Sequence, residues 1–170
     1  MQWMLATAGE PLEFHVILKA IYFADKRMLN ERGRPVFGAT YRAMNYGPVP
    51  SEVYEMLKCE PYWLSELDLQ DYPWKRIGHQ VELIDSSRHN EMPSTSCIAE
   101  KDMGIIKEEF ERSRAMSFNE RTKETHPMDW VRGAKRPDDR MAYEDMLADD
   151  YPDREKMIKY LIAIGPRLVL

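Results

Sequence analysis

Apolar residues recur at spacings of three and four along two long stretches of the chain, a pattern typical of helices that bury one face. In the first stretch the recurring residues are Phe14, Ile17, Leu18 and Ile21. That stretch predicts a helix from about residue 12 to about residue 30, ended by Gly33 and Pro35. In the second stretch the shared face carries Met103, Ile106, Phe110 and Arg114. A second long helix is therefore predicted over 100–114.

Shorter helices follow from local start and stop signals. Residues 2–8 read as a short helix, and Ser51 is placed to cap another one. Ser117 followed by Glu120 is a capping box, in which the two side chains satisfy the free backbone donors of a helix start. A last helix is expected over about 152–164. Helices therefore dominate both halves of the chain.

Alternating apolar and polar residues predict a small antiparallel β element in the middle of the chain. The alternation covers 41–46 as a short strand and 76–84 as a hairpin. Between them, the Gly-Pro-Val-Pro run at 47–50 reads as a stiff connection, and the polar segment 85–96 reads as a surface loop. The expected fold class is α+β, predominantly helical: a compact helical bundle with a small β element. Without repeats or a long linker, 1–170 is expected to form a single domain.

Composition narrows the class of protein. The chain has 170 residues, of which 44% are hydrophobic, which is enough for one packed core and argues against intrinsic disorder. Its apolar runs, such as 161–164, are far shorter than a membrane helix requires. Two cysteines, Cys59 and Cys97, provide neither a disulfide framework nor a zinc site. We expect a cytoplasmic protein without a membrane segment.

Charge is unevenly distributed along the chain. The segment 138–155 holds eight acidic residues and two arginines, a local charge of −6, whereas the whole chain carries −5. In contrast, 26–42 holds five basic residues and only Glu31, a local charge of +4. An acidic segment repels nucleic acid and attracts basic proteins, although a run of charge is most often a solvated face.

The residues that could carry chemistry do not form a recognisable catalytic or metal site. None of the four histidines has metal-ligand spacing, and no phosphate-binding loop or nucleophilic serine motif occurs. Asp25 continues the buried stripe of the first long helix, so we expect it to accept hydrogen bonds from nearby backbone or from a base such as Arg42. Asp25, His126 and Cys97 are candidates for a base, an acid–base group and a thiolate, but structural roles are favoured for each. We predict no catalytic residue, no metal and no cofactor.

An ordered series of motifs resembles the SocA-like Panacea domain, a family that also includes phage-associated proteins. The motifs are YFAD at 22–25, GRPVFG at 33–38, YRA at 41–43, YGPVP at 46–50, TH at 125–126, a tryptophan at 130 and YEDML at 143–147. The resemblance covers roughly 14–147. It marks as family-motif residues Asp25, Gly33, Pro35, Gly38, Tyr41, Gly47, Pro48, Pro50, His126 and Trp130. Most of these also have a plain structural reading as turn and core residues.

The resemblance implies an antitoxin of a bacterial or prophage toxin–antitoxin pair. Members of the family neutralise varied toxins by direct protein contact, so the expected partner is a cognate toxin protein. One branch delivers its toxin to a protease, and a protease or chaperone is therefore a further expected partner. The resemblance specifies neither the toxin class nor the oligomeric state.

Because toxins that attack RNA or nucleotides need basic clefts, carboxylates would suit a protein that covers such a cleft. We therefore hypothesise a toxin-binding surface within 138–155, with aromatic residues and methionine as anchors. The predicted partner-binding residues are Tyr143, Glu144, Asp145, Met146, Asp149 and Tyr151. Two alternatives remain open: a DNA-binding transcriptional regulator that uses 26–42, and a phage-encoded protein that binds a host factor. The acidic total charge argues against nucleic acid, and an enzyme is the least favoured class.

Overall fold

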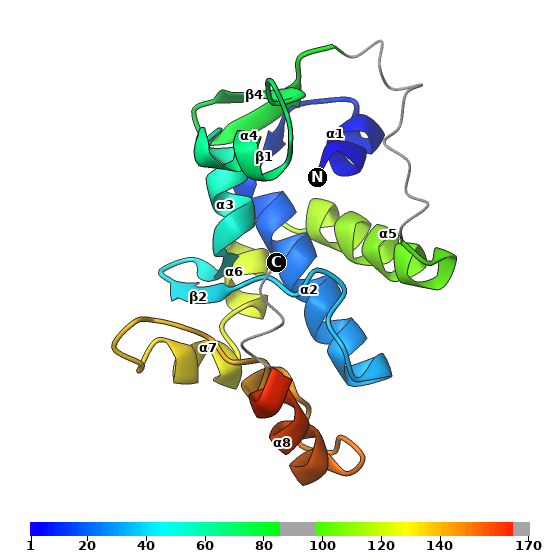
Figure 1. The fold of residues 1–170 in the computed structure, drawn as a ribbon, viewed down its shortest axis with the longest axis vertical. Coiled ribbons are helices and arrows are strands. Elements are labelled where there is room, and N and C mark those ends of the chain that lie inside the picture. The colour runs from blue at the N-terminus through cyan, green and yellow to red at the C-terminus, as the bar shows by residue number, and fades with distance from the viewer. Residues whose placement is uncertain (86–97, 165–170) are drawn as a thin grey trace.

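The computed structural model describes residues 1–85 and 98–164 (Figure 1). These residues form eight α-helices, one 3₁₀-helix and two small antiparallel sheets, which confirms a predominantly helical α+β fold. The helices are α1 (Gln2–Ala8), α2 (Phe14–Arg32), α3 (Ser51–Leu57), α4 (Tyr62–Glu66), α5 (Glu100–Ala115), α6 (Phe118–Glu124), α7 (Met128–Gly133), η3 (Tyr143–Met146) and α8 (Arg154–Ile164). The strands are β1 (Leu12–Glu13), β2 (Tyr41–Met44), β3 (Gly47–Pro50), β4 (Trp74–Ile77) and β5 (Gln80–Leu83).

Helix α2 runs through the centre of the molecule and packs against α5 (Figure 1). The predicted apolar stripe of α2 is buried, as are Val16, Ala20 and Phe23 on its other faces. The helix is enclosed because α5 covers one side while β3 and α3 pack on another. Because the helix is surrounded in this way, its charged side chains Lys19 and Asp25 are also buried and must find partners inside the fold.

The start of α2 differs from the prediction. A helix was expected from about residue 12, yet Leu12 and Glu13 form strand β1, which pairs with β5. The backbone N–H of Phe14 donates to the carbonyl of His79 at 2.9 Å, so the chain leaves the sheet only there. At its other end α2 closes as predicted, with Gly33 in the left-handed conformation at φ 71°.

The three-stranded sheet has the order β1–β5–β4 and lies with α4 at the end of the molecule opposite α8 (Figure 1). Its β4–β5 hairpin turns at Gly78, where φ is 61°, as the alternating pattern predicted. Strand β1 was missed because two residues are too few to show a period. The predicted loop over 85–96 lies almost entirely outside the described residues.

The Gly-Pro-Val-Pro run is a strand rather than a stiff connection. Residues 47–50 form β3, which pairs with β2 in the register Ala43 to Pro48 and Tyr41 to Pro50. Proline lacks a backbone donor, but both strands of a two-stranded sheet are edges, so the missing N–H costs no ladder bond. The predicted strand at 41–46 is confirmed over Tyr41–Met44.

Ser51 does not cap α3 as predicted. Its backbone N–H donates to the carbonyl of Thr40 at 2.9 Å, while its hydroxyl is buried without a partner. Pro50 occupies the cap position instead, because β3 runs directly into the helix. The other predicted cap is confirmed: Ser117 accepts from the backbone of Glu120, and the Glu120 carboxylate accepts from the backbone of Ser117.

A buried carboxylate on α2 ties together segments that are far apart in the sequence. Oδ1 of Asp25 accepts the backbone N–H groups of Val36 at 2.8 Å and Phe37 at 2.6 Å. Oδ2 accepts the hydroxyl of Tyr41 at 2.9 Å, and the hydroxyl of Tyr143 lies 3.2 Å away. Backbone donors were predicted for Asp25, whereas the predicted base Arg42 instead donates to the carbonyl of Asp138. Burial raises the pKa of Asp25, and its four hydrogen bonds oppose that shift.

Removal of this carboxylate should destabilise the fold strongly. Asp25→Ala leaves two backbone donors and the Tyr41 hydroxyl without their acceptor, so we expect a loss of more than about 3 kcal/mol of unfolding free energy. Asp25→Asn should lose less, because the amide oxygen still accepts the two N–H groups. Asp149→Ala, which alters a fully exposed carboxylate, is the control. Urea unfolding measures all three, and an Asp25→Ala protein as stable as the wild type would contradict this role.

Candidate partner-binding groove

Five elements converge on a groove of about 560 Å³. Its walls come from the first turns of α2, the β2–β3 hairpin, α3, the β4–β5 turn and the start of α6. Apolar side chains dominate the lining, among them Phe14, Met44, Tyr46, Tyr54, Ile77 and Phe118. The groove is therefore assembled by the tertiary fold and does not belong to any one segment.

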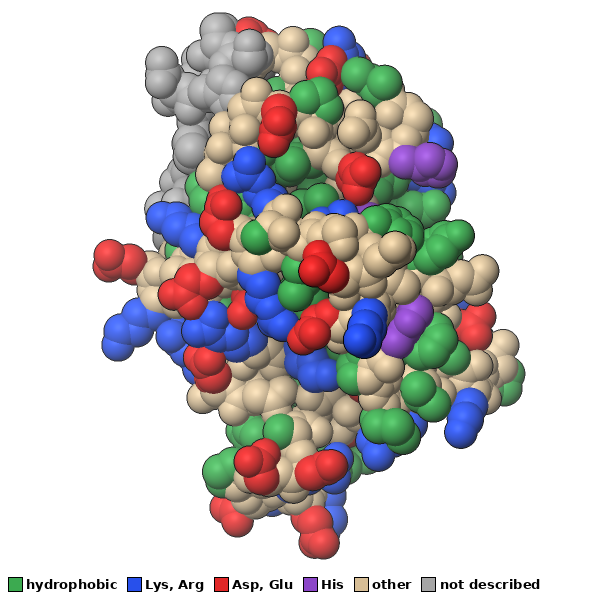
Figure 2. All heavy atoms as spheres, turned by 180° about the vertical axis from the view of Figure 1, so that it is seen from behind, with side chains coloured by type: hydrophobic (Ala, Val, Ile, Leu, Met, Phe, Trp, Pro, Cys, Tyr) green, Lys and Arg blue, Asp and Glu red, His purple; other side chains and the backbone are tan. Residues whose placement is uncertain are grey.

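Four of these apolar side chains are unusually exposed for their size. Met44 is 42% exposed, Tyr46 61%, Ile77 49% and Phe118 40%. The Tyr46 and Phe118 rings meet edge to face at 5.2 Å, and Phe118 stacks on His15 at 4.2 Å. Figure 2 shows hydrophobic and histidine side chains gathered along one side of the molecule. Aromatic and methionine side chains presented in this way are typical of the centre of a protein interface.

A buried lysine lies in the floor of the groove. The Nζ of Lys19 donates to the carbonyl of Pro48 at 2.7 Å, and the residue is fully shielded from solvent. No carboxylate among the described residues forms an ion pair with this amine. Burial lowers the pKa of Lys19 to about 7, and the positive charge of Arg121 acts in the same direction.

The hairpin glycine permits the approach of this lysine to the β3 backbone. Gly47 has φ 97°, and a Cβ there would overlap Thr125 Oγ1 and come within 3.0 Å of Lys19 Nζ. Only glycine fits both the conformation and the space. The YGPVP motif thus supplies a carbonyl to Lys19 and, through Tyr46 and Val49, part of the groove lining.

Arg121 and His15 complete the polar floor. Arg121 is almost fully buried; it donates to the carbonyls of Ser113 and Met116 and to Nδ1 of His15 at 3.0 Å. In that tautomer Nε2 of His15 donates to the carbonyl of Tyr46, 3.3 Å away. Burial and the neighbouring Lys19 lower the pKa of His15 to about 4, so its ring is neutral at pH 7. The fixed positive charge of the floor is that of Arg121.

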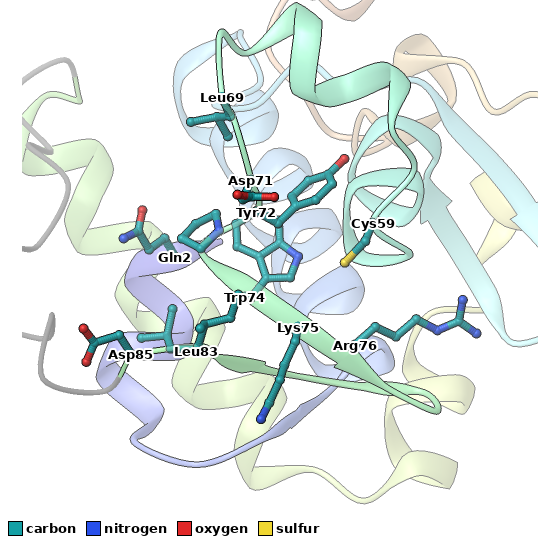
Figure 3. Close-up of a pocket in the computed structure, with 12 residues that line it drawn as sticks. Gln2, Cys59, Leu69, Asp71, Tyr72, Trp74, Lys75, Arg76, Leu83 and Asp85 are labelled. Atoms are coloured by element: carbon teal, nitrogen blue, oxygen red, sulfur yellow. The ribbon is translucent and has the colours of Figure 1, made fainter.

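A second hollow of about 850 Å³ lies on the three-stranded sheet (Figure 3). Trp74, Tyr72 and Cys59 line it, and burial raises the pKa of the Cys59 thiol, which keeps it in its less reactive form. The wall ends at Asp85, the last described residue before the gap. Cys97, the candidate thiolate, lies outside the described residues.

The family-motif residues have two structural roles: some belong to the Asp25 network and the end of α2, and others build the β2–β3 hairpin. Asp25 and Tyr41 belong to the core network, and the loop that donates to Asp25 contains Pro35 and Gly38, the latter at φ 66°. Gly33 ends α2, and two side chains approach it, that of Met157 on α8 and that of Tyr151 in the segment before α8. Gly47, Pro48 and Pro50 build the hairpin beneath the groove.

His126 and Trp130 support the same hairpin from behind. Their rings lie 4.0 Å apart, and the Trp130 indole N–H donates to the carbonyl of Met44 at 3.0 Å. Burial lowers the pKa of His126, whose Nε2 has no partner among the described residues. This arrangement fits the structural reading of His126 better than an acid–base role.

Three of the six predicted partner-binding residues make contacts within the chain, which does not favour them as partner contacts. Met146 is 1% exposed, and the Tyr143 hydroxyl bonds within the Asp25 network. Asp145 pairs with Arg136 at 2.6 Å and with Arg132 at 3.5 Å. The 3₁₀-helix η3 turns these side chains toward the core, an orientation that the acidic pattern did not reveal.

The other predicted residues remain accessible to different degrees. Asp149 has a fully exposed side chain, whereas Glu144 and Tyr151 are partly buried. Figure 2 shows acidic side chains gathered at the end of the molecule formed by α8.

The basic stretch 26–42 is neutralised within the fold. Its ion pairs are Lys26 with Asp129, Arg27 with Glu31, Glu108 and Glu109, and Arg32 and Arg34 with Asp102. Most of these acids lie on α5 and α7, so the local charge of +4 read from the sequence does not form a free basic surface. The geometry argues against the use of this stretch for DNA.

The groove residues Met44, Tyr46, Ile77 and Phe118 were not predicted as a site. The outward positions of the alternating strands were a weak signal for the first three. Their convergence with α6 depends on tertiary packing, which no local pattern shows.

Comparison with known families shows to which family the chain belongs. The model of the family described as antitoxin SocA-like, Panacea domain, matches residues 17–131, and the chain belongs to this family. No curated protein and no solved structure matches it. The YEDML block at 143–147 lies beyond the matched residues. Among the described residues no helix has the length and apolar character to cross a membrane, and no cluster suitable for a metal ion occurs.

The buried amine of Lys19 should make stability depend on pH. Its ordinary pKa is 10.5 and its folded pKa is about 7, so between these values the unfolded chain binds more protons and stability rises with pH. Lys19→Met removes this dependence, whereas its lost hydrogen bond to Pro48 costs the same at every pH. We expect the stability of the wild type relative to Lys19→Met to increase from pH 7 to pH 9, by at most about 1.4 kcal/mol per pH unit. Urea unfolding at both pH values measures it, and parallel behaviour of the two proteins would contradict the shift.

Proposed function

We propose that the protein is an antitoxin that neutralises a cognate toxin by covering part of its surface, without transforming a substrate. Membership of the SocA-like Panacea family supports the antitoxin role. The observation that carries the direct-contact mechanism is the groove, whose exposed Tyr46, Phe118, Met44 and Ile77 have the composition of an interface centre.

The supporting structure around the groove favours a binding role. Exposed large apolar side chains cost solubility, so they are retained where a partner covers them. Two hydrogen bonds hold this surface in place: the buried one from Lys19 to the Pro48 carbonyl, and the one from Trp130 to the Met44 carbonyl. A preorganised surface loses little conformational entropy on binding, which raises affinity.

A growth assay tests the role of the groove. The double variant Tyr46→Ala and Phe118→Ala, co-expressed with the product of the adjacent reading frame, should no longer restore growth, because interface aromatics carry most of the binding energy. Its affinity should fall at least about tenfold. The control is Tyr160→Ala with Ile162→Ala on α8, two side chains of similar exposure.

Thermal unfolding of both double variants verifies that each remains folded. Full rescue of growth by the groove variant would contradict the proposal, as would loss of rescue by the α8 control alone.

The acidic end near α8 is a second candidate surface. Asp149, Asp150, Asp153 and Glu155 are exposed there, and carboxylates suit a toxin whose active cleft binds phosphate. The fully exposed side chain of Asp149 is the specific feature that favours this surface. It would act beside the groove and needs no change in the fold.

Charge reversal tests the acidic end separately. Asp149→Lys with Asp150→Lys should weaken toxin binding and reduce its salt dependence, since both charges contribute to steering. Asp145 is excluded from this set because its ion pairs with Arg132 and Arg136 belong to the fold. A titration at two salt concentrations gives the answer, and unchanged affinity with unchanged salt dependence would discard this surface.

A further inference from the structure

The groove differs in charge from the rest of the molecule. Among the described residues that line it, Glu13 is the one carboxylate, and its oxygen already lies 3.3 Å from Arg121 Nη2. Since Glu13 and Arg121 offset each other, the basic groups left without an acid among the described residues are the buried Lys19 in the floor and the exposed Arg76 at the edge. A chain of formal charge −5 therefore presents one exposed basic group, Arg76, beside an apolar groove.

Arg76 is the accessible member of this basic set. Its guanidinium lies 5.8 Å from the centre of the Phe14 ring, which lines the groove, and its Nε donates to the carbonyl of Gly78 at 2.8 Å. Arg76 is exposed, and no described carboxylate forms an ion pair with it. Arg76 also lines the second hollow, where Figure 3 shows its side chain extending away from Trp74. The remaining donors of the guanidinium are thus open to a partner at the groove edge.

Other basic residues of the chain illustrate the contrast. Lys26, Arg27, Arg32 and Arg34 each contact a carboxylate of the same chain within 3.1 Å. At the edge of the groove Arg76 has no such carboxylate among the described residues, so charge complementarity assigns one to the partner.

We propose that the groove binds a segment of the toxin that places a large apolar side chain against Tyr46 and Phe118 and a carboxylate beside Arg76. This inference rests on the proposed antitoxin function and specifies the chemistry of the partner segment. The apolar side chain gains by leaving water among the exposed rings. The carboxylate gains a planar donor that a lysine would not offer, because Arg can form two parallel hydrogen bonds.

The experiment titrates the full chain with the purified product of the adjacent reading frame by isothermal calorimetry at two salt concentrations. Arg76→Glu should raise the Kd at least about fivefold and flatten its salt dependence, because it replaces attraction with repulsion. Arg76→Gln, which only removes the charge, should give a smaller rise. The control Lys107→Glu makes the same change in net charge at an exposed position on α5, which contributes to neither candidate surface, and should leave the Kd unchanged.

Each outcome separates this inference from the proposed function. Normal binding by Arg76→Glu and Arg76→Gln would overturn the carboxylate while leaving the antitoxin role in place. Tighter binding by Arg76→Glu would overturn it in favour of a basic segment. If the Tyr46→Ala and Phe118→Ala variant also binds normally, the groove itself is not the contact. Absence of binding by the wild type would reject the proposed function, and this inference with it.

Discussion

The rest of the structure depends on the hydrogen bonds of one buried side chain. The Asp25 carboxylate accepts them from backbone N–H groups and tyrosine hydroxyls. Asp25 lies on the enclosed helix α2, and its four donors come from the 36–37 loop, β2 and η3. An uncompensated charge at this depth would be very costly, so the three segments can occupy only the arrangement that satisfies it. The core therefore fixes β2, and β2 fixes the hairpin that borders the groove.

Helix α2 also holds the hairpin that borders the groove through a second side chain, Lys19. Six residues before Asp25, its amine reaches the Pro48 carbonyl under Gly47, so both strands of the hairpin are held by charged groups of α2. Trp130 completes the support through the Met44 carbonyl. Several family-motif residues thus hold the hairpin in place. The exposed side chains of the hairpin take no part in this support and can contact a partner.

Local patterns predicted the parts of the fold that depend on local physics. The two long helices followed from apolar periodicity, α6 from its capping box, and the β4–β5 hairpin from alternation. Strand β3 was missed because two prolines read as a break, although an edge strand tolerates them. Ser51 was misread as a cap because β3 leads straight into α3.

Other features depend on long-range packing, which local patterns do not show. They are the ion pairs that neutralise 26–42, the inward turn of Met146, and the groove, which joins residues as distant as Tyr46 and Phe118. The family motifs predicted the scaffold, whereas the exposed contact residues lie largely between them.

The central claim is that the groove is the surface that covers the partner. Hydrogen–deuterium exchange tests it most directly, measured on the full chain free and bound to the product of the adjacent reading frame. Our account predicts slower exchange on binding in the β2–β3 hairpin, the β4–β5 turn and the first turn of α6, with α4 unchanged. Protection confined to other elements, with the hairpin exchanging as in the free protein, would contradict it.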